Sequence, residues 1–278
     1  MAKRVRHRRR WSAHSIWLAA CSRRFWLASP QQNLRPPDDL ARILGVTVHQ
    51  IIFDSINTGP TPKREQVLAD FSKLWHTQTM DFAPDKADSM LTRGNRCLEH
   101  FFHDYFELNA RPSTLVVNTK VGVCLDRHGK AVISLDSPEK PDYELFGIVD
   151  EIRYEDGKVI IRDYKVSFHQ DKQSMFRYRL QFGIYRTCLK ATVEQEIDCE
   201  IYDLQSGMII PIESFSSGQI HALVRKAEKR ILGHSKTRNL KLCPTCQYQP
   251  VCQNPYAPWK EWRRNLICPE QLSLSPNP

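Results

Sequence analysis

The sequence has no acidic residue before Asp38, no internal repeat and no long low-complexity segment. It also lacks an apolar run near the roughly 20 residues that a membrane-spanning helix needs. These absences exclude a membrane-embedded or repeat-built protein. A chain of 278 residues, 41% hydrophobic and 26% charged, is long enough for one sizeable core. We therefore expect a soluble, cytoplasmic, globular protein without a membrane partner.

Basic residues are concentrated at the start of the chain. Nine of the 40 Lys and Arg residues lie in the first 37 residues, which contain no acid. The other 31 basic residues balance the 31 acidic ones, so the net charge of +9 comes from this first segment. We expect residues 1–11 to form a basic arm that binds phosphate backbone without reading sequence. A solubilising or targeting tail is the alternative. A secretory signal is not expected, because the apolar segment 16–21 is short and Arg23 and Arg24 follow it.

The nine cysteines are odd in number, and three of them, Cys243, Cys246 and Cys252, fall within ten residues. This clustering indicates a metal site in a reducing compartment rather than a disulfide framework. A zinc ribbon or an iron-sulfur cluster needs a fourth ligand, and only His234 or Cys268 is near in sequence. Four other cysteines, Cys97, Cys124, Cys188 and Cys199, are expected to be small buried apolar residues.

Hydrophobic periodicity predicts an α/β protein whose helical first part precedes a sheet. The helix bearing Gln181 follows the central hairpin, and a strand pair and a basic-faced helix come after it. The predicted helices cover residues 12–28, 38–56, 63–75, 86–108 and 219–232, and the predicted strands cover residues 114–126, 131–135, 196–204 and 208–212, with a hairpin over residues 146–165.

The predicted hairpin carries acids at defined places. Asp150 ends one apolar run, and Asp163 and Lys165 point to the same side of the next strand because strand side chains alternate. Two carboxylates and the carbonyl of Tyr164 are hard ligands for Mg or Mn, and an ammonium can orient water beside a phosphate. Read alone, Asp-x-Lys is more often a solvated strand end.

The hairpin motifs, Gly147-Ile148-Val149-Asp150 and Asp163-Tyr164-Lys165, resemble those of the RecB-type branch of the PD-(D/E)XK nuclease superfamily. Gln181 and Tyr185 match the Q-x-x-x-Y that follows in this branch, and Gly45 with His49 matches its earlier G-x-x-x-H. The resemblance implies a restriction-endonuclease-like central mixed sheet flanked by helices.

The same resemblance implies roles for individual residues. His49, Asp150, Asp163 and the Tyr164 carbonyl would bind Mg or Mn, and Lys165 would act in catalysis together with the two acids. The pair of Gln181 and Tyr185 would support the site and touch DNA.

Cys21, in the segment CSRRFWL, resembles the upstream cysteine of iron-sulfur members of this branch, although Ser22 stands where proline is usual. CRISPR-associated adaptation exonucleases and AddB-type subunits are such members. Their pattern implies a 4Fe-4S cluster held by Cys21, Cys243, Cys246 and Cys252, with zinc as the less favoured occupant. Such a cluster would join the first helix to the last loop.

The resemblance thus implies one nuclease domain over residues 12–278, with a helical lobe at 57–110 and an iron-sulfur region built from 12–28 and 234–268. The implied function is a metal-dependent exonuclease for mainly single-stranded DNA or DNA with a free end, in DNA processing, repair or CRISPR adaptation. A helicase or integrase partner is compatible with it. The alternative is a non-catalytic DNA-binding or assembly subunit that keeps the fold.

Overall fold

The computed structural model describes residues 9–28, 39–58, 62–108, 115–132 and 141–233, together with Cys246, Tyr248 and Cys252. Most of the predicted basic arm and the predicted cluster ligand Cys243 lie outside these residues. The chain divides into two compact units. The first comprises Met1–His14 and Asp39–Leu223, and the second comprises Ser15–Asp38 and Val224–Pro278.

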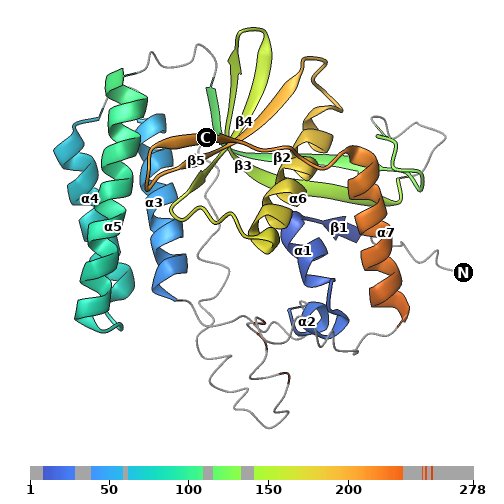
Figure 1. Ribbon diagram of the computed structural model, residues 1–278, viewed down its shortest axis with the longest axis horizontal. Helices are drawn as coiled ribbons and strands as arrows, with labels where there is room; N and C mark the ends of the chain where they lie inside the picture. Colours follow the sequence, from blue (N-terminus) through green and yellow to red (C-terminus); the bar gives the residue numbers. More distant parts are fainter. Residues whose placement is uncertain are drawn as a thin grey trace, which may run out of the picture. The chain divides into compact units, whose positions relative to one another are not determined.

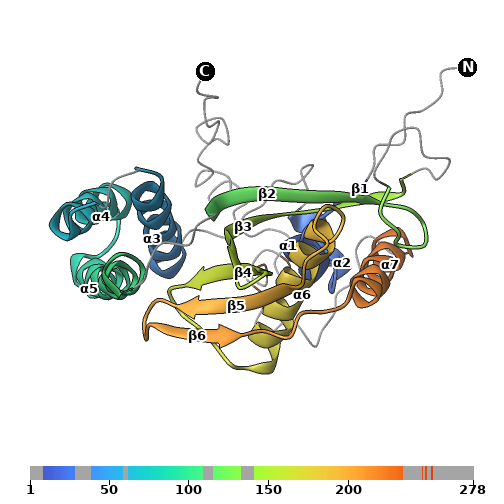
Figure 2. The ribbon, with the colours of Figure 1, turned by 90° about the horizontal axis from the view of Figure 1, so that it is seen from above.

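A six-stranded mixed sheet forms the centre of the first unit (Figures 1 and 2). The pairs β1–β3 and β4–β5 are parallel, and the pairs β2–β3, β3–β4 and β5–β6 are antiparallel. The fold class predicted from the sequence, a mixed sheet flanked by helices, is confirmed. The strands are β1 (Arg9–Trp11), β2 (Leu115–Leu125), β3 (Tyr143–Glu155), β4 (Lys158–Lys165), β5 (Ile197–Asp203) and β6 (Met208–Pro211).

The predicted hairpin is the β3–β4 pair. Its ladder runs from Glu155 opposite Lys158 to Glu151 opposite Arg162. The turn residues Asp156 and Gly157 have φ values of 48° and 80°, and this left-handed backbone suits the twist of a tight hairpin. The turn therefore fixes the register that places Asp150 and Asp163 just beyond the ladder.

Helices cover both faces of the sheet. Three of them, α3 (Leu40–Asn57), α4 (Arg64–Thr79) and α5 (Pro84–Phe102), lie side by side in both views (Figures 1 and 2). A single turn of π-helix, η1 (His103–Leu108), continues α5. Helix α6 (Lys172–Leu189) packs on the sheet, and its Asp171 cap accepts hydrogen bonds from the first turn. Helix α7 spans Ser217–Gly233.

Alternation along β4 and β5 divides the core into two clusters. Tyr164 and Tyr202 pack with α3, α4 and α5, whereas Ile161 and Ile201 pack with α6. The α3–α5 cluster is anchored by buried aromatic side chains, among them Phe71 and Trp75. Each face of the central strands is thus sealed by a different group of helices.

Several predicted elements differ from the structure. Residues 12–28 form two helices, α1 (Ala13–Leu18) and α2 (Ser22–Leu27), so the prediction that Cys21 lies inside one helix is wrong. Cys21 has extended backbone angles of −130° and 112°, and this break lets Leu18 and Leu27 pack into one cluster with Tyr248. In the second unit, Ser22 Oγ also donates to the carbonyl of Arg230 at 3.0 Å.

Two further differences concern the sheet. The first strand, β1, was not predicted, although the side chain of Trp11 is buried. The strand expected at residues 131–135 is reduced, in its described part, to an isolated bridge between Ala131 and Leu125. Within the described ranges, no helix has both the length and the apolar character that crossing a membrane requires.

Candidate active site

The site begins at a gap along one edge of β3. This edge pairs with β1 at Tyr143–Leu145 and with β4 from Glu151 onward. Between these segments, at Asp150, the carboxylate Oδ2 accepts the hydrogen bond of the Tyr164 N–H at 2.9 Å. The Asp150 side chain thus accepts a hydrogen bond that a backbone carbonyl of β3 would accept if the β3–β4 ladder continued. The two strands separate at Asp150, which makes room for a third group.

That third group is His49, from α3. Its Nε2 lies 3.1 Å from Asp150 Oδ2, and its Nδ1 lies 2.7 Å from the carbonyl of Gly45, one helical turn earlier. Burial opposes charging of the imidazole, but the adjacent Asp150 carboxylate outweighs it and raises the pKa of His49 to about 9. Burial likewise opposes ionisation of Asp150, yet the charge and hydrogen bond of His49 hold its pKa below the ordinary value.

The second acid, Asp163, is buried beside Lys165, and the two form a direct ion pair. Burial raises the pKa of Asp163, Lys165 opposes this, and the neighbouring Asp150 charge adds to it. Burial opposes charging of Lys165, but the Asp163 carboxylate raises its pKa, so the ammonium persists. The site therefore holds two acids and two bases in close electrostatic contact.

Helix α6 orients Asp163 through two polar side chains. Gln181 Nε2 lies 2.8 Å from Asp163 Oδ1 and 2.7 Å from the Tyr185 hydroxyl. That hydroxyl donates to the carbonyl of Ile148 on the edge of β3. The two residues, one helical turn apart, thus connect β4 to β3 across the site.

The Tyr185 ring lies directly over Gly147. A Cβ at this position would stand 2.4 Å from the ring, closer than any real contact. Glycine is required here by close approach, and the spacing between Gly147 and Asp150 keeps Tyr185 and the first acid in fixed relation. The two motifs recognised separately in the sequence are therefore one packed unit.

The donor set fits a hard divalent cation. Asp163 Oδ2 is buried and, apart from its ion pair with Lys165, accepts no hydrogen bond from the described residues. His49, with Nδ1–H held by the Gly45 carbonyl, presents Nε2 as a ligand in its neutral form. In the described ranges, no three His, Cys, Asp or Glu side chains are arranged as a formed metal cage. The present partners of the two acids are His49 beside Asp150 and Lys165 beside Asp163.

Comparison with known proteins identifies the family. The model of the PD-(D/E)XK nuclease superfamily matches residues 10–253. The chain belongs to the PD-(D/E)XK nuclease superfamily. A solved structure titled "Crystal structure of SSO0001" is similar to this superfamily member at 16% identity, covering 74% of this chain and 94% of that one, with a TM-score of 0.35. Among curated proteins, none matches this nuclease-family chain.

Within this nuclease fold, the structure brings together His49, Asp150, Asp163 and Lys165, with Gln181 and Tyr185 behind them. Their catalytic and metal-binding roles stay predictions. Sequence reasoning missed one acid, Glu151, which is fully buried on the opposite face and accepts the Tyr164 hydroxyl at 2.6 Å. The sequence signal that could have identified Glu151 is its position directly after Asp150, as a second acid in the same strand.

The cysteines predicted to hold a cluster are partly described. Cys21 and Cys252 are buried, and Cys252 packs with Tyr248, Leu18 and Leu27. Burial raises the pKa of Cys246, which also packs against this cluster, but among the described residues no three thiols are arranged as a metal-binding group. Segments from opposite ends of the sequence therefore meet in the second unit.

Proposed function

We propose that this protein is a metal-dependent DNA exonuclease that acts mainly on single-stranded DNA with a free end. The observation that carries the proposal is the convergence of His49 and Asp150 with Asp163 and Lys165 at the point where β3 and β4 separate. The resemblance of its motifs to RecB-type nucleases supports the preference for DNA ends.

Each residue has a definable task in this proposal. The two carboxylates, His49 Nε2 and the Tyr164 carbonyl would hold Mg or Mn, with Gln181 fixing the rotamer of Asp163. When bound, the metal supplies Lewis acidity toward the phosphate and its attacking water. Lys165 remains protonated beside Asp163, and its N–H groups would orient the water and offset charge on the phosphate.

Hydrolysis of labelled DNA tests this function. We expect the wild-type protein with Mn to release mononucleotides or short products from linear single-stranded DNA, and to leave a circular strand of the same sequence intact. Chelation of the metal is expected to stop the reaction. Cleavage of circular DNA at the linear rate would overturn the exonuclease assignment. DNA binding without cleavage, unchanged by Asp150→Ala, would instead support a non-catalytic DNA-binding or assembly subunit.

We further propose that Cys21, Cys243, Cys246 and Cys252 hold a 4Fe-4S cluster. Cys246 and Cys252 pack in one cluster with Leu18 and Leu27, which lie on either side of Cys21 in the sequence, and this supports the proposal because four thiolates are the usual donor set for such clusters. The cluster would connect the two ends of the chain structurally. Zinc in the same site is the alternative occupant.

Metal analysis tests the cluster. Protein purified without oxygen is expected to contain about four irons per chain and to absorb visible light. Cys252→Ser is expected to lose most of this iron, whereas Cys199→Ser, which changes a buried thiol in the other unit, is expected to keep it. Equal iron in both variants, or one zinc per wild-type chain, would contradict the iron-sulfur proposal.

DNA processing, repair and CRISPR adaptation are all compatible with this activity, as is a helicase or integrase partner. Identification of the DNA end that is attacked would narrow these roles.

A further inference from the structure

Asn118, in the middle of β2, has a left-handed backbone. Its φ is 49°, and among the described residues Asp156 of the β3–β4 turn is the only other non-glycine residue with a positive φ. The hairpin explains the value at Asp156, but a residue of an antiparallel strand normally has a φ of about −140°. Asparagine tolerates the left-handed region better than most side chains, yet it is uncommon there. The conformation of Asn118 is therefore a feature that needs a structural reason.

The position of Asn118 in the sheet supplies this reason, because it stands opposite Asp150 in the β2–β3 ladder. The ladder pairs Val117 with Glu151 and resumes in the same register at Thr119, so no extra residue is inserted. The intervening position, where Asn118 faces Asp150, is not paired in the ladder. The left-handed residue and the first acid of the candidate site therefore share one position of the sheet.

Strand β3 exchanges its two faces at this position. In a regular strand, residues two apart share a face. Val149 belongs to the buried cluster that packs with α6, the α6 cluster, but Glu151 accepts the hydroxyl hydrogen bond of Tyr164, which belongs to the α3–α5 cluster. Ile152, an odd number of residues from Val149, packs against the α6 cluster again. The face of β3 that contacts α6 therefore changes between Val149 and Glu151.

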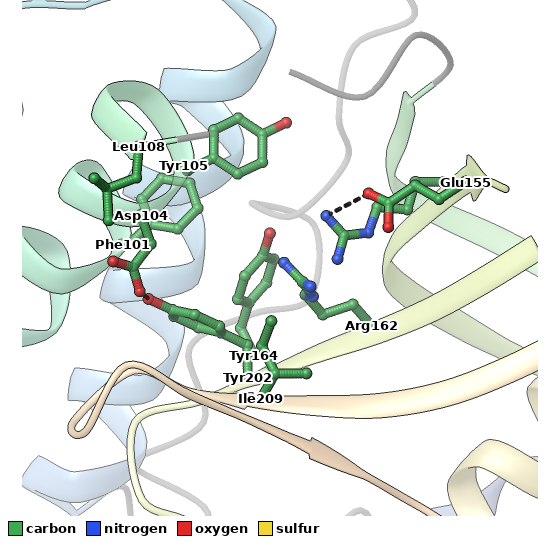
Figure 3. A pocket seen from close by; sticks show the side chains of 10 residues that line it. Phe101, Asp104, Tyr105, Leu108, Glu155, Arg162, Tyr164, Tyr202 and Ile209 are labelled. Carbon is green, nitrogen blue, oxygen red and sulfur yellow. Dashed lines mark hydrogen bonds and ion pairs between the residues drawn. The ribbon is translucent and has the colours of Figure 1, made fainter. Parts of the chain in front are cut away.

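The part of β3 beyond Asp150 confirms the exchange. Arg153 and Glu155 line a cavity of about 330 Å³ behind β4, and Arg153 also pairs with Glu200 of β5 at 3.0 Å. Figure 3 shows Glu155 on one side of this cavity and Phe101, of the α3–α5 cluster, on the other. Odd-numbered residues of β3 thus face the α3–α5 cluster after Asp150, although Val149 faces α6 before it.

Strand β2 makes the same exchange at the same place. Val117 packs against the α3–α5 cluster, whereas Val121, an even number of residues away, packs against the α6 cluster. Asn118 lies between them with its left-handed φ. Alternation requires every residue to keep extended angles, so one residue with a reversed φ redirects the side chains that follow it. Strand β3 follows this change because ladder pairs join it to β2 on both sides of Asn118.

Asp150 lies at the midpoint of the exchange, so its side chain projects along the sheet toward β4. In agreement with this direction, its Oδ2 accepts the Tyr164 N–H at 2.9 Å. His49 of α3 reaches the same carboxylate at 3.1 Å, from the helix group opposite the one whose Gln181 holds Asp163. In a regular strand the Asp150 side chain would stand on one face, and its bond to the backbone of β4 would be lost.

We propose that Asn118 is a positioning residue for Asp150, because its left-handed backbone turns the β2–β3 pair so that the Asp150 carboxylate points toward β4. The significance for catalysis rests on the proposed nuclease function, but the geometry can be measured without metal or DNA. The property that matters is the φ of residue 118. Glycine adopts a positive φ without steric cost, alanine does so at some cost, and β-branched valine resists it.

Hydrogen exchange of the Tyr164 amide, followed by NMR on the full chain in EDTA, measures whether Asp150 is in place. We expect Asn118→Val to speed exchange of this amide by roughly a hundredfold or more, and Asn118→Gly to change it by less than about threefold. The amide of Ile161, a buried residue of the same strand, should keep its rate in both variants. Lys120→Val, an exposed change two residues along β2, is the matched control and should leave the Tyr164 amide unchanged.

Three outcomes would overturn the positioning role. Exchange of the Tyr164 amide at one rate in Asn118→Gly and Asn118→Val would show that φ does not matter. Acceleration by Asn118→Gly as large as that by Asn118→Val would show that the asparagine amide matters instead. Equal acceleration of Tyr164 and Ile161 would show a general loss of stability. If Asn118→Val does not fold, Asn118→Ala decides, with exchange of the Tyr164 amide expected roughly tenfold faster than in Asn118→Gly.

The same variants connect this role to the proposed function. With Mn and single-stranded DNA, we expect Asn118→Val to lower kcat by roughly a hundredfold relative to Asn118→Gly, with KM changed by less than about threefold, because residue 118 directs a site acid and does not bind the strand. If the wild-type chain cleaves no DNA, the proposed function fails. The exchange rates, which need neither metal nor DNA, would still decide whether Asn118 positions Asp150.

Discussion

Replacing Asp150 by asparagine is expected to lower the rate of DNA cleavage by roughly a thousandfold or more. The carboxylate contacts His49 at 3.1 Å and the Tyr164 N–H at 2.9 Å, at the point where β3 and β4 separate. An amide has nearly the same shape but carries no charge, so it is a poor ligand for a hard cation. The rate should be measured at saturating DNA over a range of Mn concentrations.

The same substitution has a second expected result, which does not require DNA. The pKa of His49, about 9 in the metal-free protein, is held up by Asp150 against burial. In Asp150→Asn only burial and the weaker groups remain, so this pKa is expected to fall below 6.5. Titration of the imidazole by NMR gives the value directly. Asp54→Asn, an exposed change on the same helix, is the control, and a His49 pKa near 9 in Asp150→Asn would contradict the described pair.

These shifts also set the pH range in which the pair stabilises the metal-free fold. The pKa of His49 is raised on folding, so its contribution is complete below about 6.5 and is lost as the pH rises through about 9. The pKa of Asp150 is lowered, so its contribution is present above about 3.8 and is lost in more acidic solution. The free energy of unfolding of wild type should therefore exceed that of Asp150→Asn most clearly between about pH 3.8 and about pH 6.5.

Gly147→Ala is expected to reduce the free energy of unfolding by about 1–3 kcal/mol and to impair cleavage at the same time. The added methyl group would stand 2.4 Å from the Tyr185 ring, so the ring must move away from β3. That movement breaks the bond from the Tyr185 hydroxyl to Ile148 and disturbs Gln181, which holds Asp163. Denaturant unfolding and the cleavage rate measure the two effects.

Gly122→Ala provides the matched control for this prediction. Gly122 lies on β2 in the same sheet, and a Cβ there would meet its nearest atom at 3.5 Å, an ordinary contact. We expect its effects on stability and on cleavage to be small. Loss of the same stability in both variants would show that strand glycines matter for backbone reasons alone, without a contribution from Tyr185.

The sequence predicted the centre of the fold well because local chemistry determines it. The acid and glycine at the turn select one hairpin register, and alternation then places Asp163 and Lys165 on one side. The family match bears out the superfamily named from these motifs. Strand β1 was missed because three residues next to many arginines carry no alternating pattern, and only pairing with β3 makes them a strand.

Other features depend on contacts between distant segments. The break at Cys21 arises where Leu18 and Leu27 must both face one cluster, and an apolar run of this kind is also typical of a continuous helix. The cavity behind β4 joins side chains of α5, η1, β3, β4, β5 and β6. No local pattern brings Arg153 to Glu200, so this network becomes visible only in three dimensions.

The composition of the second unit has a consequence for synthesis of the protein. Ser15–Asp38 leaves the ribosome before the whole of Asp39–Leu223, yet it completes its unit only with Val224–Pro278. At ordinary translation speeds the delay is on the order of ten seconds or more. During this time Leu18, Leu27 and the Cys21 thiol of the nascent chain lack their final neighbours. We therefore expect a chaperone that shields apolar segments to bind the nascent chain until residues 224–278 are made.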